Sequence, residues 1–521
     1  MQLSANTRKT IGYALIGLGV LFFLWSATAY CFSSKRWLLV GDATYAYLLN
    51  GLNVATGHGV YHTDHPGTTV QILCALFVRI YYFFAPDAGT NGLVVSVLTH
   101  PEWYLKNVFI GFFVVQAAIL AVVAAWVWAS FKNIALLLAV LVSPFISPQL
   151  LMIQSEELWP ESLIPAMCLL LVLVTLMRWR ETTLAQPYPS RLLALGAGVV
   201  TGLAFFTKIT CLPIFFMSFF FWKDKKSWLY YLLGFASIVL VCVPLLWGQL
   251  DRTVFWLVNL ATHEGHYGTG PEGLVSAGIF RANMRRMFSF NMPFAVLLVV
   301  NLAGLVVLRK KRRSLGWKIS LLYMFSVVVS LLLIGKHYRS HYVMPLYFLL
   351  FFIPVVYFAL AENVYKKTAA YVVCLIFLVS SCYALYTTAT TTAREVFTGK
   401  FANYDLPVLQ GKTIVESFNT FTISHGLAQG NHYVAGRYGD ILRALYPNIY
   451  TYNIWANQFH HFEQLLPFSV IASGRPVIIR GDRLTTNNPE HSNFTSRLIL
   501  GRQLASFPEG DRVFELLDVQ K

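Results

Sequence analysis

The chain has 521 residues, of which 56% are hydrophobic and only 12% are charged, and its mean hydropathy is +0.56. Soluble domains contain about 25% charged residues, so this composition excludes an ordinary soluble enzyme and indicates an α-helical polytopic membrane protein. Basic loops and anionic lipids account for the formal net charge of +16, and no nucleic-acid motif is present, so we expect no nucleic-acid partner.

Apolar segments in the first 389 residues predict about eleven membrane-spanning helices. A span needs about 20 apolar residues, and the segments lie near 11–32, 106–129, 133–149, 160–178, 191–207, 209–222, 227–248, 291–308, 317–335, 342–361 and 368–388. With this count, all strongly basic loops fall on one side of the membrane, which the positive-inside rule makes cytoplasmic. We therefore expect a cytoplasmic N-terminus and an extracytoplasmic C-terminus.

The first outer loop, residues 33–105, is rich in titratable side chains. Asp42 occurs in a Gly-Asp turn soon after the first span, and it fits a general base or a helix N-cap equally well. Segments 44–57 and 68–84 have amphipathic patterns, so we expect helices that lie on the membrane surface. The motif HTDHPG contains His62, Asp64 and His65; this spacing is loose for a metal site, so a divalent metal is compatible with it but not required.

Three further segments place charged residues on the same side. QSEELWPES contains three glutamates, which complement a helix N-terminus, and we choose Glu157 as the one that assists at the site. Lys208 ends the segment GLAFFTK, and KHYRSHYVMP contains His337 and Arg339. Basic residues at the end of a span either extend to the interface or bind an anionic group such as phosphate.

The character of the chain changes after residue 390. TIVESF, YVAG, NIYTYNI, PVIIRGD and RVFELL have strand patterns, whereas YGDILRALY and NQFHHFEQLL have helical spacing. We therefore divide the chain into a transmembrane module, 1–389, and a small extracytoplasmic α/β domain, 390–521.

These motifs together resemble the GT-C superfamily of polytopic glycosyltransferases, which includes protein O-mannosyltransferases and bacterial lipid A aminoarabinose transferases. Asp42 matches the acidic residue of the family's first outer loop, and DHPG is similar to its His-Pro turn. GLAFFTK and RSHYVMPLY are similar to a Gly-Leu-Ala…Thr-Lys segment and to a late Arg-Tyr…Pro segment. The chain departs from the family pattern at Ala43, Gly67 and His341, which leaves the substrate open.

The resemblance implies that a sugar, a hexosyl or pentosyl group, is transferred with inversion from a polyprenyl-phosphate donor to a glycan, lipid or protein acceptor. The reaction would take place at the outer face of a bacterial inner membrane, without a required cofactor. Asp42 would take the acceptor proton, assisted by Glu157. Lys208 and Arg339 would stabilise the leaving phosphate. The other substrate-binding residues would be His62, Asp64, His65 and His337.

Three alternatives stay open. A transporter or flippase for a lipid-linked or anionic solute would need ionisable residues in mid-span, of which the sequence contains few. A non-catalytic envelope-assembly protein would use its outer domain to bind a polysaccharide or a partner. A polymerase or ligase of lipid-linked glycans would share the donor and differ in the acceptor.

Overall fold

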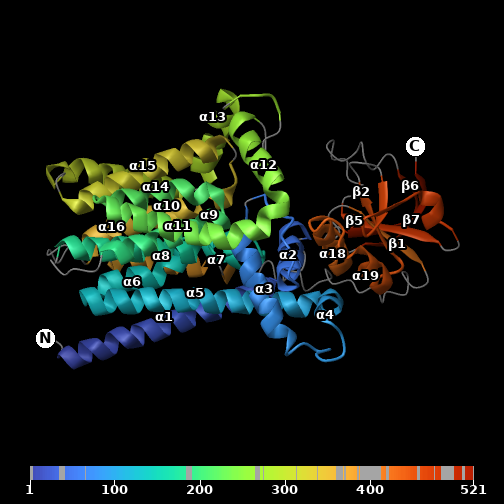
Figure 1. The fold of residues 1–521 in the computed structure, drawn as a ribbon, viewed down its shortest axis with the longest axis horizontal. Coiled ribbons are helices and arrows are strands. Elements are labelled where there is room, and N and C mark those ends of the chain that lie inside the picture. The colour runs from blue at the N-terminus through green and yellow to red at the C-terminus, as the bar shows by residue number, and fades with distance from the viewer. Residues whose placement is uncertain are drawn as a thin grey trace.

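The computed structural model of the chain describes residues 4–34, 41–64, 66–183, 190–264, 270–273, 275–290, 292–311, 314–336, 338–359, 368, 371–383, 386–387, 412–417, 422–453, 458–473, 476–482, 498–506 and 511–519. These residues form a bundle of long helices followed by a small C-terminal region that contains a sheet (Figure 1). The predicted helical membrane module with a small C-terminal α/β region is confirmed at this coarse level.

The helices of the bundle are rich in Leu, Val, Ala, Ile and Phe. Several begin or end at recognisable caps. Asn133 and Asp224 accept backbone hydrogen bonds at helix N-termini, and Lys132 takes a left-handed conformation after α5. The bundle helices are α1 (Ala5–Ser34), α5 (Pro101–Phe131), α6 (Ile134–Val142), α7 (Pro148–Glu156), α8 (Ile164–Thr183), α9 (Ser190–Thr207), α10 (Leu212–Phe216), α11 (Lys225–Leu246), α14 (Met292–Val307), α15 (Leu315–Lys336) and α16 (Met344–Ala359).

Five helices in the described part of the chain are long and apolar enough to cross a membrane: Asn6–Ser33, Pro101–Phe131, Ser190–Thr207, Lys225–Thr262 and Leu315–Lys336. A sixth span results if Ala277–Ser289 and Phe294–Val307, which are bent by 93°, count as one. Other apolar helices are shorter, in part because Pro144, Pro148 and Pro213 interrupt helical hydrogen bonding. These helices support a membrane protein, and they fall short of the eleven spans predicted from the sequence.

One end of the bundle, which we call the loop end, carries short helices that lie between the long helices and the C-terminal region (Figure 1). Helices α2 and α3 cover the two segments that we expected to lie on a membrane surface, and α3 exposes the apolar side chains of Leu76 and Ile80. Helix α2 differs from that expectation, because α3 and the C-terminal region cover it and bury nine of its ten residues. The elements of the loop end are η2 (Gly41–Tyr45), α2 (Ala46–Ala55), α3 (Thr68–Tyr82), α4 (Leu93–Thr99), α12 (Leu250–Thr262) and α13 (Ala277–Phe290).

The C-terminal region contains a seven-stranded sheet of order β4-β3-β2-β1-β5-β7-β6. The central strands β2, β1 and β5 are parallel, and the outer strands pair antiparallel. The strands are β1 (Thr413–Ser417), β2 (Ile449–Asn453), β3 (Gln458–His461), β4 (Gln464–Leu466), β5 (Val477–Asp482), β6 (Leu498–Ser506) and β7 (Asp511–Val519); the helices are α18 (Ile423–His432), α19 (Gly439–Leu445) and α20 (Phe468–Ile471).

Two local predictions for this region are wrong. NQFHHFEQLL forms the β3–β4 hairpin instead of a helix, with Phe462 (φ 46°) and Glu463 (φ 78°) in a tight turn that needs two positive φ angles. YVAG is a turn instead of a strand, in which Ala435 and Gly436 have positive φ. Gly436 is a usual turn residue, whereas Ala435, Phe462 and Glu463 seldom adopt positive φ and give no sequence signal for a turn.

The core of the bundle continues into the C-terminal region through α18 and α19. Leu427 and Leu442 belong to the same buried cluster as Tyr45, Tyr47 and Leu48 of the loop end. The strands have a separate small core. The two helices are therefore the layer that attaches the sheet to the bundle.

Candidate active site

Segments that are far apart in the sequence meet at the loop end. The hydroxyl of Thr44 accepts a hydrogen bond from the backbone N–H of Leu158 at 3.2 Å, which joins the turn η2 to the acidic segment QSEELWPES. Pro66 and Lys208 form an isolated antiparallel bridge, which joins the HTDHPG loop to the end of α9. The Lys208 side chain extends from there to the acidic segment and to the RSHY segment. All four predicted segments thus adjoin one another.

Glu161, Lys208 and His341 form a charged cluster at this meeting point. Oε1 of Glu161 contacts Nζ of Lys208 and lies 3.4 Å from Nε2 of His341. Glu161 and Lys208 are buried, and Nζ of Lys208 lies 4.2 Å from the centre of the Tyr342 ring. Burial lowers the pKa of Lys208, and Cys211 nearby opposes this shift. The cluster is a buried ion pair with an imidazole at its edge.

Short irregular turns direct these side chains inward. Glu161 lies in a 3₁₀ turn, Pro160–Ser162, between α7 and α8. Lys208 is extended, with φ −159° and ψ 118°, between α9 and the following 3₁₀ turn. His341 lies in the 3₁₀ turn Ser340–Val343, which precedes α16. Each side chain therefore comes from a break between apolar helices, where the chain can turn a polar group toward its neighbours.

The two predicted catalytic carboxylates belong to adjoining turns. Asp42 is part of η2, and its side chain lies outside what the structure describes. Glu157 ends α7 in an extended conformation and is half-buried, and its carbonyl oxygen accepts a hydrogen bond from Oγ of Ser162 at 2.9 Å. In this acidic segment Glu161, which we did not choose from the sequence, makes the ion pair.

The predicted phosphate-binding residues differ in their access to a ligand. Lys208 is already paired with Glu161, so an anion would have to compete with that carboxylate. Arg339 is exposed at the beginning of the turn that contains His341. His65 and His337, which we predicted as substrate-binding residues without assigning them to the phosphate, lie outside the described residues.

His62 and Asp64 occupy different environments although they are close in sequence. The His62 ring is buried and packs edge-on against Tyr47 and against Tyr433 of the C-terminal region, with ring centres 5.1 and 4.7 Å away. Asp64 is partly exposed, and its Oδ1 lies 3.8 Å from Nη2 of Arg252 on α12. His62 is thus a packing residue of the loop end, whereas Asp64 is accessible to solvent there.

The C-terminal region forms a wall against the turn that contains Asp42, which the sequence did not predict. Helix α18 packs on η2 through two glycines: a Cβ atom on Gly426 would lie 2.4 Å from the Tyr45 ring, and one on Gly430 would lie 2.8 Å from the Tyr45 carbonyl oxygen. Nδ2 of Asn50 donates a hydrogen bond to the carbonyl oxygen of Tyr433 at 3.1 Å. The close approach requires glycine at both positions of α18.

His425 is a second unexpected feature of this wall. It is buried in the first turn of α18, and neither ring nitrogen has a hydrogen-bond partner among the described residues. Burial lowers its pKa to about 4. The imidazole is therefore neutral at physiological pH, and it contributes no positive charge beside η2.

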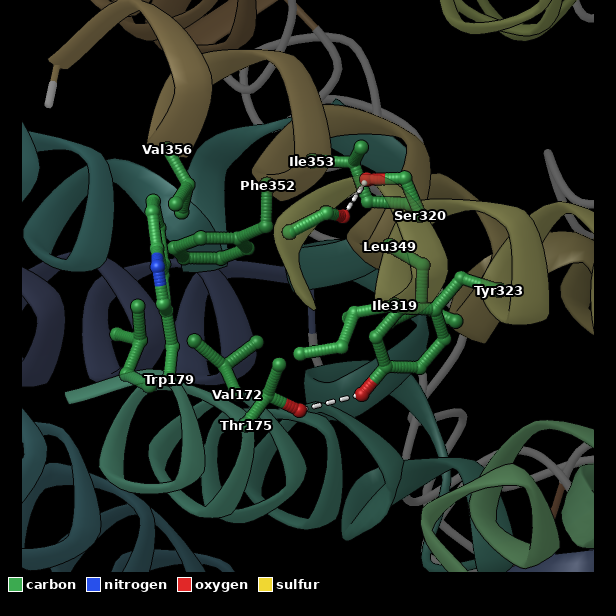
Figure 2. A pocket seen from close by; sticks show the side chains of 12 residues that line it. Val172, Thr175, Trp179, Ile319, Ser320, Tyr323, Leu349, Phe352, Ile353 and Val356 are labelled. Atoms are coloured by element: carbon green, nitrogen blue, oxygen red, sulfur yellow. Dashed lines mark hydrogen bonds between the residues drawn. The ribbon is translucent and has the colours of Figure 1, made fainter. Parts of the chain in front are cut away.

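A cavity of about 60 Å³ lies between α8, α15 and α16, away from the charged cluster. Its lining is almost entirely apolar, with Trp179, Phe352 and Val356 on one side (Figure 2). The hydroxyls of Thr175 and Tyr323, which belong to the lining, form a hydrogen bond of 2.5 Å with each other. A cavity of this kind offers no acid–base chemistry, so we assign the candidate active site to the loop end.

No three His, Cys, Asp or Glu side chains within the described ranges come together as a metal site requires. The chain was also compared with known proteins. No protein-family model, no curated protein and no solved structure matches it.

Proposed function

We propose that the chain is a membrane glycosyltransferase of the GT-C type, which moves a sugar from a polyprenyl-phosphate donor to an acceptor hydroxyl. The meeting of the η2 turn, the acidic segment, Lys208 and the RSHY segment at one end of an apolar bundle carries this proposal. A reaction between a lipid-borne phosphate and a polar acceptor needs acids and cations side by side at the end of membrane helices.

The proposed reaction is an inverting displacement. The acceptor oxygen attacks the anomeric carbon, its proton passes to the Asp42 carboxylate, and the bond between that carbon and the phosphate oxygen breaks. Glu157, in the adjoining turn, assists on the acceptor side. Arg339 stabilises the charge that develops on the departing phosphate, and Lys208 supports it from the buried pair.

The finer topology belongs to the same proposal. We propose about eleven spans in a bacterial inner membrane, with the N-terminus in the cytoplasm and the C-terminal domain outside. The loop end then faces outward, where α18 and α19 form part of the acceptor side. Helix α8 and the short apolar helices 134–145, 209–221, 341–354 and 371–383 are the five additional spans that this topology needs beside the six described above.

The test is transfer of radiolabelled sugar from polyprenyl-phosphate donors in membranes that contain the full chain. Asp42→Asn removes the proton acceptor and should reduce the transfer rate by at least about a hundredfold. Asp251→Asn, on α12, is the matched control and should leave the rate within twofold.

The outcomes separate the alternatives. Loss of transfer in Asp42→Asn alone, at equal protein level, supports the proposed role. Equal transfer by both variants removes Asp42 as the base and leaves Glu157 as the next carboxylate to replace. Absence of transfer by the unmodified protein from every donor and acceptor contradicts the proposed function and favours a transporter or an assembly protein.

A further inference from the structure

The three side chains of the charged cluster differ in their access to the outside. The side chains of Lys208 and Glu161 are only 2% and 1% exposed, whereas the side chain of His341 is 20% exposed. A ligand that arrives at the loop end therefore meets the imidazole, and the ion pair lies behind it. His341 is the only titratable member of this cluster that a ligand reaches directly.

The surroundings of His341 hold the ring in one orientation. Its centre lies 4.8 Å from the ring of Trp159 and 4.7 Å from the ring of Tyr342, so aromatic groups flank it on two sides. Nε2 faces the Glu161 carboxylate at 3.4 Å. The imidazole therefore lies beside a carboxylate that is already in contact with the Lys208 ammonium.

Both signs of charge surround the imidazole. Among the described side chains on the elements packed around His341, the charged ones are Lys208 after α9, Arg339 in its own segment, Glu161 in the turn before α8 and Glu157 just after α7. Two further acidic residues, Asp42 of η2 and Glu156 at the end of α7, have side chains outside what the structure describes. Protonation of His341 adds one positive charge at the exposed edge of this group, so that proton should strengthen the binding of an anion here.

We propose that His341 is a catalytic acid for the departing phosphate, positioned by Glu161; this inference rests on the proposed function. When the bond between the anomeric carbon and the phosphate oxygen breaks, the phosphodiester becomes a phosphomonoester with one additional negative charge. The imidazolium transfers a proton to a phosphate oxygen, and His341 becomes neutral. The second pKa of a phosphomonoester, about 6, is close to that of imidazole, about 6.5, so the transfer is nearly balanced.

The experiment measures binding of farnesyl phosphate, a short prenyl phosphate with the headgroup of the leaving group, to the purified full chain at pH 6.0 and 8.0. Because the phosphate itself gains a negative charge between these pH values, each protein is compared with His341→Gln at the same pH. The unmodified protein should bind about tenfold more tightly than His341→Gln at pH 6.0, and this ratio should fall toward one at pH 8.0, because a charge-assisted hydrogen bond is lost when His341 deprotonates. His341→Lys keeps a positive charge and should bind more tightly than His341→Gln at both pH values.

His58→Gln is the matched control, since His58 is an exposed histidine of the first loop and Nδ1 of its ring contacts only the nearby Thr56 hydroxyl, at 3.1 Å, among the described residues. It should bind like the unmodified protein. If the unmodified protein and His341→Gln bind with the same affinity ratio at both pH values, the role of His341 is wrong while the proposed function stands. If the unmodified protein binds farnesyl phosphate at neither pH and transfers no sugar, the proposed function itself is contradicted, and the role of His341 falls with it.

Discussion

Helix α8 has an ion pair near each end, and the two pairs are built differently. At the end that precedes α9, Arg178 and Glu181 lie on the same helix three residues apart, with a 2.5 Å contact, and the arginine stacks over Trp222. Before the other end, Glu161 joins Lys208 and His341, which lie 47 and 180 residues later in the chain. The Arg178–Glu181 pair is local, whereas the Glu161 contacts join three turns that lie between different helices of the bundle.

This difference separates structural from functional charge. A local pair forms whenever the helix forms, and such pairs contribute about 0.2–0.5 kcal/mol. A buried pair between distant segments forms only when the fold is complete, and removal of one partner leaves an uncompensated charge in the interior. Burial of the Glu161 pair carries a desolvation penalty, and for this reason we connect the pair with the proposed site and not with stability alone.

The largest effect is expected from Glu161→Gln. This substitution leaves the Lys208 ammonium buried without its counter-charge, so the free energy of unfolding should fall by about 3–5 kcal/mol. Denaturant titration of the purified protein in detergent, followed by tryptophan fluorescence, measures the change. The double variant Glu161→Gln, Lys208→Met should recover most of the loss. Unchanged stability in the single variant would mean that Lys208 is neutral in the folded protein.

An intermediate effect on stability is expected from Gly430→Ala. This variant tests whether an uncharged contact between segments far apart in the sequence also stabilises the fold. Its Cβ atom would lie 2.8 Å from the Tyr45 carbonyl oxygen, so α18 or η2 must move, at a cost of about 1–3 kcal/mol. The thermal midpoint of the full chain measures this cost. Gly196→Ala in α9, where nothing lies within 4 Å of the added atom, should be neutral or slightly stabilising. Equal midpoints for both variants would contradict close packing of α18 on η2.

The smallest effect is expected from Glu181→Gln, the counterpart of Glu161→Gln at the other end of α8. It removes a local pair and leaves the Arg178 guanidinium above Trp222, so the free energy of unfolding should change by less than about 0.5 kcal/mol. The same denaturant titration gives the comparison. A loss similar to that of Glu161→Gln would show that the local and distant pairs are equivalent, and the distinction drawn above would be lost.

The segments of the site were predictable, but their detailed contacts were not. The acidic segment, Lys208 and the RSHY segment stand out in the sequence because they are charged segments at the ends of apolar runs. These segments lie next to one another, as expected. The choice between Glu157 and Glu161 depends on a three-residue 3₁₀ turn, which has no periodic pattern. Helix α18 was missed because ISHGLAQGNH contains two glycines and several polar residues, which lower helix propensity. The same glycines allow its contact with η2.

The contact between Asn50 and Tyr433 spans 383 residues of chain. At a synthesis rate of about 5–20 residues per second, the first loop is complete roughly 20–80 s before its partner leaves the ribosome. During that time the turn that contains Asp42 lacks the wall that α18 provides. A nascent chain can therefore insert its membrane helices and still lack this contact, so the proposed site is complete only after α18 has been translated and has folded.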